Sequence, residues 1–161
     1  MNKKLFNLFK SDQADRAPDK IRSYDAVKNG WKRLMDADIR RLKEVRRILK
    51  TDKNLNAEDY FHAAMVFQHG QKLSDYKMAA SLAKTSAELG DEKAKWLYAA
   101  ATDRLLVNLG RKQKYGTQYQ KESGKWVLMP VDRRTSDHTR TKYNVPNLRE
   151  AKARARVMNK I

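Results

Sequence analysis

The sequence predicts a mainly α-helical domain, built from helical hairpins, with one small β-hairpin and a C-terminal helix. Apolar residues recur at helical spacing over most of the chain, glycines punctuate three successive helical segments, and a run of β-forming residues follows the last of these glycines. A chain of 161 residues with 40% hydrophobic residues is long enough to bury one core. We therefore expect a single helical domain over residues 23–161, after a basic segment over residues 1–22.

The N-terminal third is predicted to contain a frayed basic terminus and one long helix. The apolar run at residues 5–9 is shorter than a signal sequence or a membrane span requires. A short helix that associates with a surface is the alternative for this run. Pro18 and the alternating charges around it are typical of a linker or of the start of a helix. Helical spacing from Ser23 to Leu49 then predicts an amphipathic helix, in which Gly30 marks a candidate break.

Three shorter helices with brief links are expected over residues 57–70, 74–90 and 92–110. Each segment ends at a glycine, which suits the position after a helix C-terminus. An aromatic residue followed by small residues recurs at Phe61 and Tyr98, 37 positions apart, which is close to the period of helix-pair repeats. The second and third segments together look like a tetratricopeptide or Sel1-type hairpin, so we expect helical hairpins of that type.

In the C-terminal third, β-forming residues replace the helical periodicity of the preceding segments. The β-forming runs YGTQYQ and KWVLMPV flank the turn-like sequence KESG, which predicts a β-hairpin within residues 115–131. The polar residues 132–143 are expected to be irregular. The capping-box spacing of Asn147 and Glu150 predicts a final basic helix that extends to about residue 159.

The formal net charge of +17 is concentrated at the two ends of the chain. Residues 1–50 hold 15 Lys/Arg and 7 Asp/Glu, residues 51–110 hold 7 and 8, and residues 111–161 hold 14 and 4. Such an excess repels itself unless anions bind it, so we expect an anionic partner, either nucleic acid or an acidic protein, with acidic lipid as a further candidate. On the final helix a solvated face is the alternative to nucleic-acid binding. The candidate nucleic-acid-binding residues are Arg149, Lys152, Arg156 and Lys160.

Several kinds of site are excluded by residue type. The chain has no cysteine, so it holds no disulfide, thiolate zinc site or cysteine nucleophile. It lacks a Walker loop, a dinucleotide fingerprint, a nucleophile elbow and an HExxH motif, so no cofactor is predicted. Asp59, His62 and His69 share a helix stripe, but the histidines lie about 10 Å apart along the axis, so no metal is predicted. No apolar run reaches membrane-spanning length, and a cytoplasmic location is expected.

Asp103 and Arg104 are charged residues on an otherwise small and apolar helix surface. Neither has an oppositely charged neighbour at helical spacing, so each needs a partner from elsewhere in the fold. The structural interpretation is a tertiary salt bridge that ties this helix to the following loop. The functional interpretation is a site wall in which Arg104 grips an anion. The next stretch, QKYGTQY at residues 113–119, suits either a ligand site or an inward-packed strand.

Separated polar motifs follow one another between residues 50 and 160: a Gln-His-Gly helix end, an Asp-Arg pair, a Gln-x-Tyr-Gly-Thr-Gln stretch, and an Asp-x-x-Arg before an Asn-Val-Pro segment. They fall on Gln68, His69, Asp103, Arg104, Gln113, Tyr115, Gly116, Thr117, Gln118, Asp137 and Arg140. In these motifs the region resembles a bacterial family of small helical domains of unknown function. The resemblance implies that the polar residues converge in the fold, and it implies no particular reaction.

Three functional hypotheses follow from these residues. The first is a basic binding module that holds an anionic partner or a phosphate-bearing ligand. Its candidate ligand-binding residues are Gln68, Gln113, Tyr115, Gly116, Asp137 and Arg140. The alternative is a hydrolase or transferase with a histidine base, an aspartate that orients it, an arginine anion clamp and two positioning residues, namely His69, Asp103, Arg104, Thr117 and Gln118. The third is a structural protein whose polar network specifies the fold.

Overall fold

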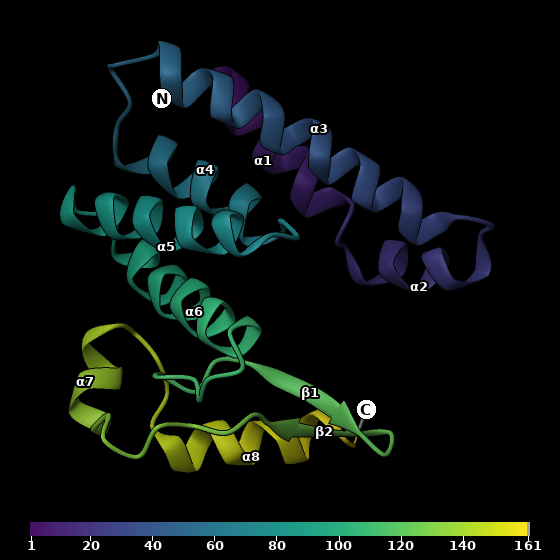
Figure 1. Ribbon diagram of the computed structural model, residues 1–161, viewed down its shortest axis with the longest axis vertical. Coiled ribbons are helices and arrows are strands. Elements are labelled where there is room, and N and C mark those ends of the chain that lie inside the picture. Colours follow the sequence, from purple (N-terminus) through teal and green to yellow (C-terminus); the bar gives the residue numbers. More distant parts are fainter. Residues whose placement is uncertain (161) are drawn as a thin grey trace.

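The computed structural model describes residues 1–160 and confirms a mainly helical fold with one β-hairpin. In chain order the elements are α1 (Lys3–Ala14), α2 (Pro18–Ala26), α3 (Gly30–Thr51), α4 (Ala57–Gln68), α5 (Leu73–Glu88), α6 (Glu92–Asn108), β1 (Tyr119–Glu122), β2 (Lys125–Leu128), α7 (Asp137–Lys142) and α8 (Leu148–Met158). Figure 1 shows three tiers, with α1 and α3 above, α4 to α6 in the middle, and the β-hairpin with α7 and α8 below, while α2 lies to one side below the far end of α3. Over the described residues, no helix is both long enough and apolar enough to cross a bilayer.

The N-terminal residues are not frayed, and that prediction is wrong. They form α1, whose first turn is capped by the Asn2 side chain, which accepts hydrogen bonds from the Lys4 and Leu5 amides. The Asn2 amide donates in turn to the buried carboxylate of Asp59 at the start of α4. Leu5 is fully buried in the main core, because the apolar run at residues 5–9 lies on α1 and α1 packs along α4. Pro18, in the segment predicted as a linker or helix start, begins α2.

The helix predicted from Ser23 to Leu49 is in fact two helices. It is broken between α2 and α3, where Asn29 adopts a left-handed conformation with φ 61°. Gly30 is needed at this break because a Cβ there would come within 2.5 Å of the Tyr24 carbonyl oxygen. The break lets α2 fold back beside the start of α3 at one end of the upper tier (Figure 1).

One apolar core joins the upper and middle tiers. Leu5 of α1, Val45 of α3, Phe67 of α4 and Leu97 of α6 are all buried in it. Buried alanines along α4, α5 and α6 keep these helices close together, which confirms the predicted helical hairpins. Their tetratricopeptide or Sel1 type stays a prediction. A smaller apolar cluster around Tyr115 joins α6 to the lower tier.

The α4–α5 link depends on a close approach at Gly70. A Cβ at this glycine would overlap the side chain of Asp75. Asp75 is held there because its carboxylate accepts the Lys72 amide and so caps α5. Helix α5 therefore begins at Leu73, slightly before the start predicted from the sequence.

The lower tier contains the predicted hairpin and final helix. Tyr119 pairs with Leu128 across the strands, and both turn residues, Ser123 and Gly124, have positive φ angles of 48° and 79°, as in a type I′ turn. Helix α8 starts at the predicted capping box and packs on β2. The Asn159 side chain ties the C-terminal end of α8 to β2, because it accepts a hydrogen bond from the Trp126 backbone amide and donates one to the Trp126 carbonyl. The polar segment expected to be irregular contains α7, which Ser136 caps.

His62 has a structural role between α1 and α4. Its side chain is 4% exposed and stacks on Phe9 with ring centroids 4.5 Å apart. Its Nδ1 atom is buried and has no hydrogen-bond partner. Burial lowers the pKa of His62, because a charged imidazolium would lose its hydration there, and this effect outweighs the nearby carboxylates of Glu58 and Asp59.

We expect His62→Phe to flatten the dependence of stability on pH. The unfolded chain binds a proton on His62 near the ordinary pKa of 6.5, whereas the folded chain binds it only at lower pH. The free energy of unfolding therefore falls as the pH drops below 6.5, by at most about 1.4 kcal/mol per pH unit from this residue.

Urea unfolding of both proteins between about pH 7.5 and pH 5 measures this difference in slope. His138→Gln, which removes an exposed histidine, serves as the matched control and should keep the wild-type slope. Parallel pH profiles for the wild type and His62→Phe would contradict the prediction.

Candidate functional site

The buried carboxylate of Asp103 organises the QKYGTQY stretch. Its Oδ1 accepts the amides of Lys114 and Tyr115 at 2.6 and 2.8 Å. Its Oδ2 accepts the amides of Gly116 and Thr117 at 2.8 and 3.0 Å, and the Thr117 hydroxyl at 2.9 Å. The predicted tie between α6 and the following loop is therefore present, but it is made by backbone amides and not by a salt bridge.

Gln113 and Arg140 hold the same stretch from two further sides. The Gln113 amide nitrogen donates to the carbonyls of Gln118 and Met129, and its oxygen accepts the Gln118 amide. Arg140 is 2% exposed and donates to the carbonyls of Tyr115 and Thr135 and to the carboxylate of Asp137. These candidate ligand-binding residues are thus bonded to the protein's own backbone. Gly116 and Tyr115 are buried with them.

Arg104 faces away from Asp103, toward the end of α4. It donates to the Gln68 carbonyl at 2.7 Å and to the Gln118 side chain at 3.3 Å. No carboxylate of the described residues pairs with it, and burial lowers the pKa of its guanidinium. The structure therefore brings Gln68, Arg104 and Gln118 together, in an arrangement that neutralises the negative end of the α4 dipole.

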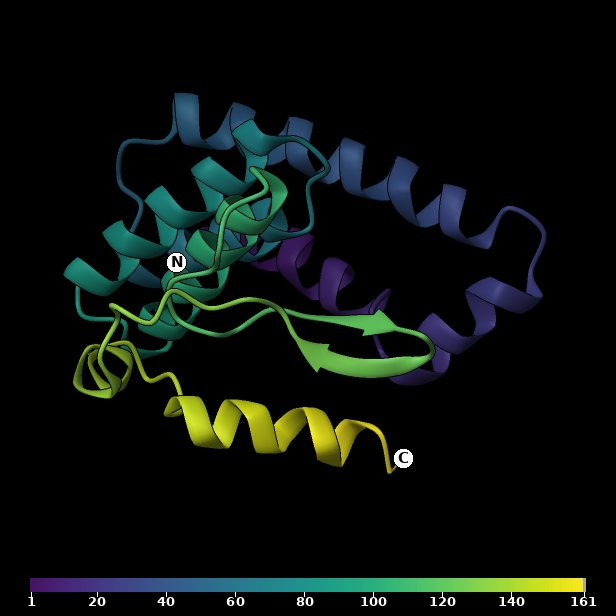
Figure 2. The same cartoon turned by 60° about the horizontal axis from the view of Figure 1, so that its bottom comes forward.

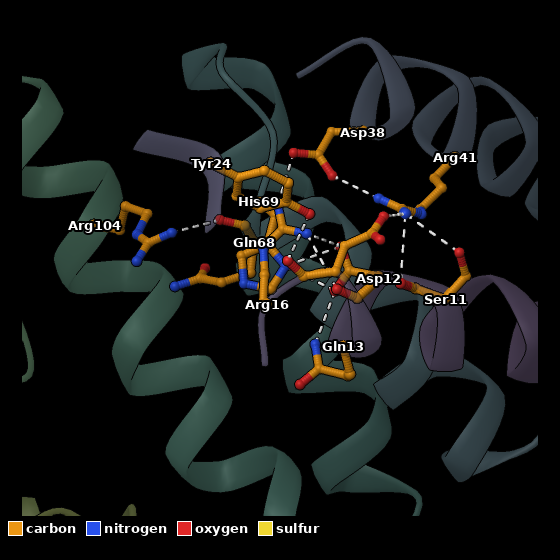
Figure 3. A network of polar contacts seen from close by, with 11 residues as sticks. Ser11, Asp12, Gln13, Arg16, Tyr24, Asp38, Arg41, Gln68, His69 and Arg104 are labelled. Atoms are coloured by element: carbon orange, nitrogen blue, oxygen red, sulfur yellow. Dashed lines mark hydrogen bonds and ion pairs between the residues drawn. The ribbon is translucent and has the colours of Figure 1, made fainter. Parts of the chain in front are cut away.

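His69 lies next to Gln68 at the end of α4, and it contacts polar residues of α1 and not Asp103 (Figure 3). Its Nδ1 atom lies 2.9 Å from the fully buried carboxylate of Asp12, which also accepts bonds from Gln13 and Arg16. The predicted pairing of His69 with Asp103 is wrong, because Asp103 is used by the loop amides. Asp12 is the residue that the sequence reasoning missed. It lies one helical turn beyond Leu8 on the apolar side of α1, and a charge in such a position is a signal for a buried partner.

The network extends from Asp12 through Arg16 into α3. Arg16 donates to Asp38 at 2.6 Å, and Arg41 donates to the same carboxylate at 2.9 Å. Arg41 also pairs with Asp15 and bonds the Ser11 hydroxyl. A histidine oriented by a buried aspartate is the arrangement that a general base requires. However, His69 lines none of the hollows described below.

A hollow lined by basic side chains and a tryptophan lies between β2 and α8, and we call it the β2–α8 groove. It has a volume of about 530 Å³. Trp126 and the following hairpin residues form one wall, and α8 forms the other. No acidic side chain lines this hollow, and the basic residues that line it are Lys112, Arg133, Lys152 and Arg156.

The β2–α8 groove includes two of the four candidate nucleic-acid-binding residues. Lys152 and Arg156 line it, whereas Arg149 and Lys160 are exposed on α8 without lining it. A second hollow of about 550 Å³ adjoins the groove at Lys112, and its basic residues include Arg111 and Lys114. Asp132, which is paired with Arg134, is the acidic residue in the lining of this second hollow.

Comparison with known proteins gives no relative to guide the assignment. No protein-family model matches the chain, and searches of curated proteins and of solved structures return no match. The family resemblance noted in the sequence stays a prediction, and the function has to be argued from the site.

We expect Asp103→Asn to lower the free energy of unfolding by about 2–4 kcal/mol. An asparagine fills the same space, but its amide nitrogen would face two backbone N–H donors that are left buried without an acceptor. Urea unfolding measures the loss. The matched control is Asp132→Asn, which removes the partner of Arg134 at the solvent-exposed surface and should change the free energy of unfolding far less. Equal stability of the two variants would show that the loop does not depend on the carboxylate.

Proposed function

We propose that this protein binds single-stranded nucleic acid in the β2–α8 groove. The observation that supports this proposal is the lining of the groove, which combines four basic side chains and a tryptophan with no acidic side chain. Grooves that bind single strands without sequence preference combine positive charge for the backbone with aromatic faces for the bases.

The charges of the groove are available to an anion. Among the described residues, Lys112, Arg133, Lys152 and Arg156 take part in no ion pair, whereas the neighbouring Arg134 is paired with Asp132. Cations from both walls can therefore contact successive phosphates of one strand. Arg149 and Lys160 extend this positive surface along α8 beyond the groove.

The size of the groove favours a single strand. Its volume of about 530 Å³ falls in the range of small-ligand sites, which suits a nucleotide unit and is too small for a duplex. Trp126 is half-buried, so part of its indole stays accessible for a base to stack on. Lys121 lies 5.4 Å from the centre of this ring and adds a positive charge beside it.

We expect the double variant Lys152→Ala, Arg156→Ala to bind a fluorescein-labelled oligothymidine more weakly and with less dependence on salt. Each phosphate contact on a single strand contributes about 0.7 to the slope of log K against log salt, so the slope should fall by about 1.4. The matched control is Lys77→Ala, Lys93→Ala, which removes two exposed lysines of the middle tier that form no ion pair. Fluorescence anisotropy at several salt concentrations measures both slopes. Equal slopes for the two double variants would overturn the assignment, as would the absence of binding at low salt.

We expect Trp126→Leu to weaken binding of the same oligothymidine at least about fivefold while leaving the salt slope unchanged. Base stacking on an aromatic side chain contributes about 1–3 kcal/mol, and leucine retains the apolar contact with the groove without a ring. The anisotropy titration separates the two effects, because the loss of stacking does not alter counterion release. Unchanged affinity would rule out a stacked base.

A further inference from the structure

Helix α3 carries apolar residues on a side that the core does not use. Leu34, Val45 and Ile48 are buried in the interior, whereas Trp31, Met35 and Ile39 are 44%, 45% and 57% exposed. The exposed three are spaced four residues apart, so they form a straight stripe along the helix. Trp31 packs on α2, because its indole N–H donates to Asp25 and its ring lies 5.5 Å from that of Tyr24. Met35 and Ile39 belong to neither apolar cluster of the interior, so packing within the fold does not account for this part of the stripe.

The stripe leads into a hollow of about 540 Å³ between α3 and the α4–α5 link. Ile39 belongs to both, and Leu42 lies beside it in the lining of the hollow. On the opposite side the lining includes Gly70, where the absence of a side chain leaves only backbone. We call the stripe and the hollow together the α3 groove.

The charges that remain available around the α3 groove are positive. Its two acidic residues are already used, Asp38 by Arg16 and Arg41, and Asp75 by Arg46 and the Lys72 amide. Of its basic residues, Arg46 and Arg47 are paired with carboxylates. Lys43, Lys50 and Lys72 take part in no ion pair among residues 1–160. The groove thus has an apolar floor and a cationic rim.

We propose that the α3 groove binds an acidic amphipathic helix of a partner protein. Such a helix presents apolar residues every three or four positions, which match the stripe and the hollow, and its flanking Asp and Glu residues face the three lysines. The stripe extends from Trp31 to Ile39, about 12 Å along α3, so two or three turns of a partner helix can lie along it.

The structure favours this occupant over the other candidates. A second copy of this chain would bring its own charge of +17 to a cationic rim. A nucleic acid would place phosphates over the apolar side chains of Ile39 and Leu42. A bilayer surface needs a protruding apolar face, whereas these two side chains line a hollow.

This site is separate from the proposed nucleic-acid groove. Helix α3 lies at one side of the molecule and α8 at the other in both views (Figures 1 and 2). The two proposals therefore stand independently, and variants of one groove serve as controls for the other.

A fluorescein-labelled synthetic peptide of about 18 residues provides the test. It carries leucines at helical spacing on one face and glutamates on the others. One control peptide has the same composition in an order that forms no apolar face, and a second has lysine in place of each glutamate. We expect the acidic amphipathic peptide to bind at least about tenfold more tightly than either control, as measured by fluorescence anisotropy.

Two variants locate the binding. Ile39→Glu places a negative charge in the floor at an exposed position, so the fold is retained, and it should weaken peptide binding at least about tenfold. Lys43→Glu, Lys50→Glu should weaken it to a similar extent, whereas the Lys152→Ala, Arg156→Ala variant should bind the peptide like the wild type. Circular dichroism and urea unfolding check that each variant is folded.

Four outcomes would overturn the proposal. The first is no binding of the acidic peptide, and the second is binding that Ile39→Glu leaves unchanged. The third is equally tight binding of the reordered peptide, which would indicate charge alone. The fourth is binding of phosphatidylserine vesicles through Ile39 without binding of the acidic peptide, which would assign the face to a membrane. Failure of oligothymidine binding would leave this result unchanged.

Discussion

The path of the chain beyond α6 depends on one buried carboxylate. The Asp103 carboxylate accepts hydrogen bonds from the backbone amides of four consecutive residues, Lys114 to Thr117. These bonds fix the backbone of the loop that follows α6. Converging N–H groups stabilise an anion without a counter-ion, as at other concave backbone sites. The loop sets the start of β1, β1 aligns β2, and α8 packs on β2. The walls of the β2–α8 groove are therefore positioned by a residue that does not line it.

The upper tier uses charge in a different way. Asp12, Asp38 and Arg41 are buried between α1 and α3, where a small domain ordinarily places apolar residues. Buried ion pairs contribute little net stability, because desolvation offsets most of the attraction, but they penalise any misaligned packing that leaves one charge unpaired. Together with His69 they fix how α1 and α3 are aligned with the end of α4 (Figure 3). Arg41 is the basic residue of α3 that this buried network uses, and the other basic residues of α3 lie nearer to solvent.

The sequence predicts the elements whose signals are local. The hairpin turn and the capping box of α8 are confirmed because each is encoded within a few residues. One error is local, because the segment expected to be irregular contains α7, and the others concern contacts between distant parts of the chain. Leu5 lies in a segment whose local sequence predicts a frayed terminus, and only its packing against α4 buries it. His69 and its partner Asp12 are 57 positions apart in the sequence. The tie between Asp103 and the following loop is expected from the sequence, but its chemistry is not: the partners are backbone amides, which every residue except proline carries, so no side-chain pattern reveals them.

The separation of the two basic tiers by a nearly neutral one has an electrostatic consequence. The net charge of +17 is therefore divided between two separate regions, so an approaching polyanion is attracted at either end. One layer of helices is about 10 Å thick, comparable to the screening length in physiological salt. An anion that occupies one end therefore hardly weakens the attraction at the other. The charge distribution thus consists of two separate cationic ends and not of one cationic face.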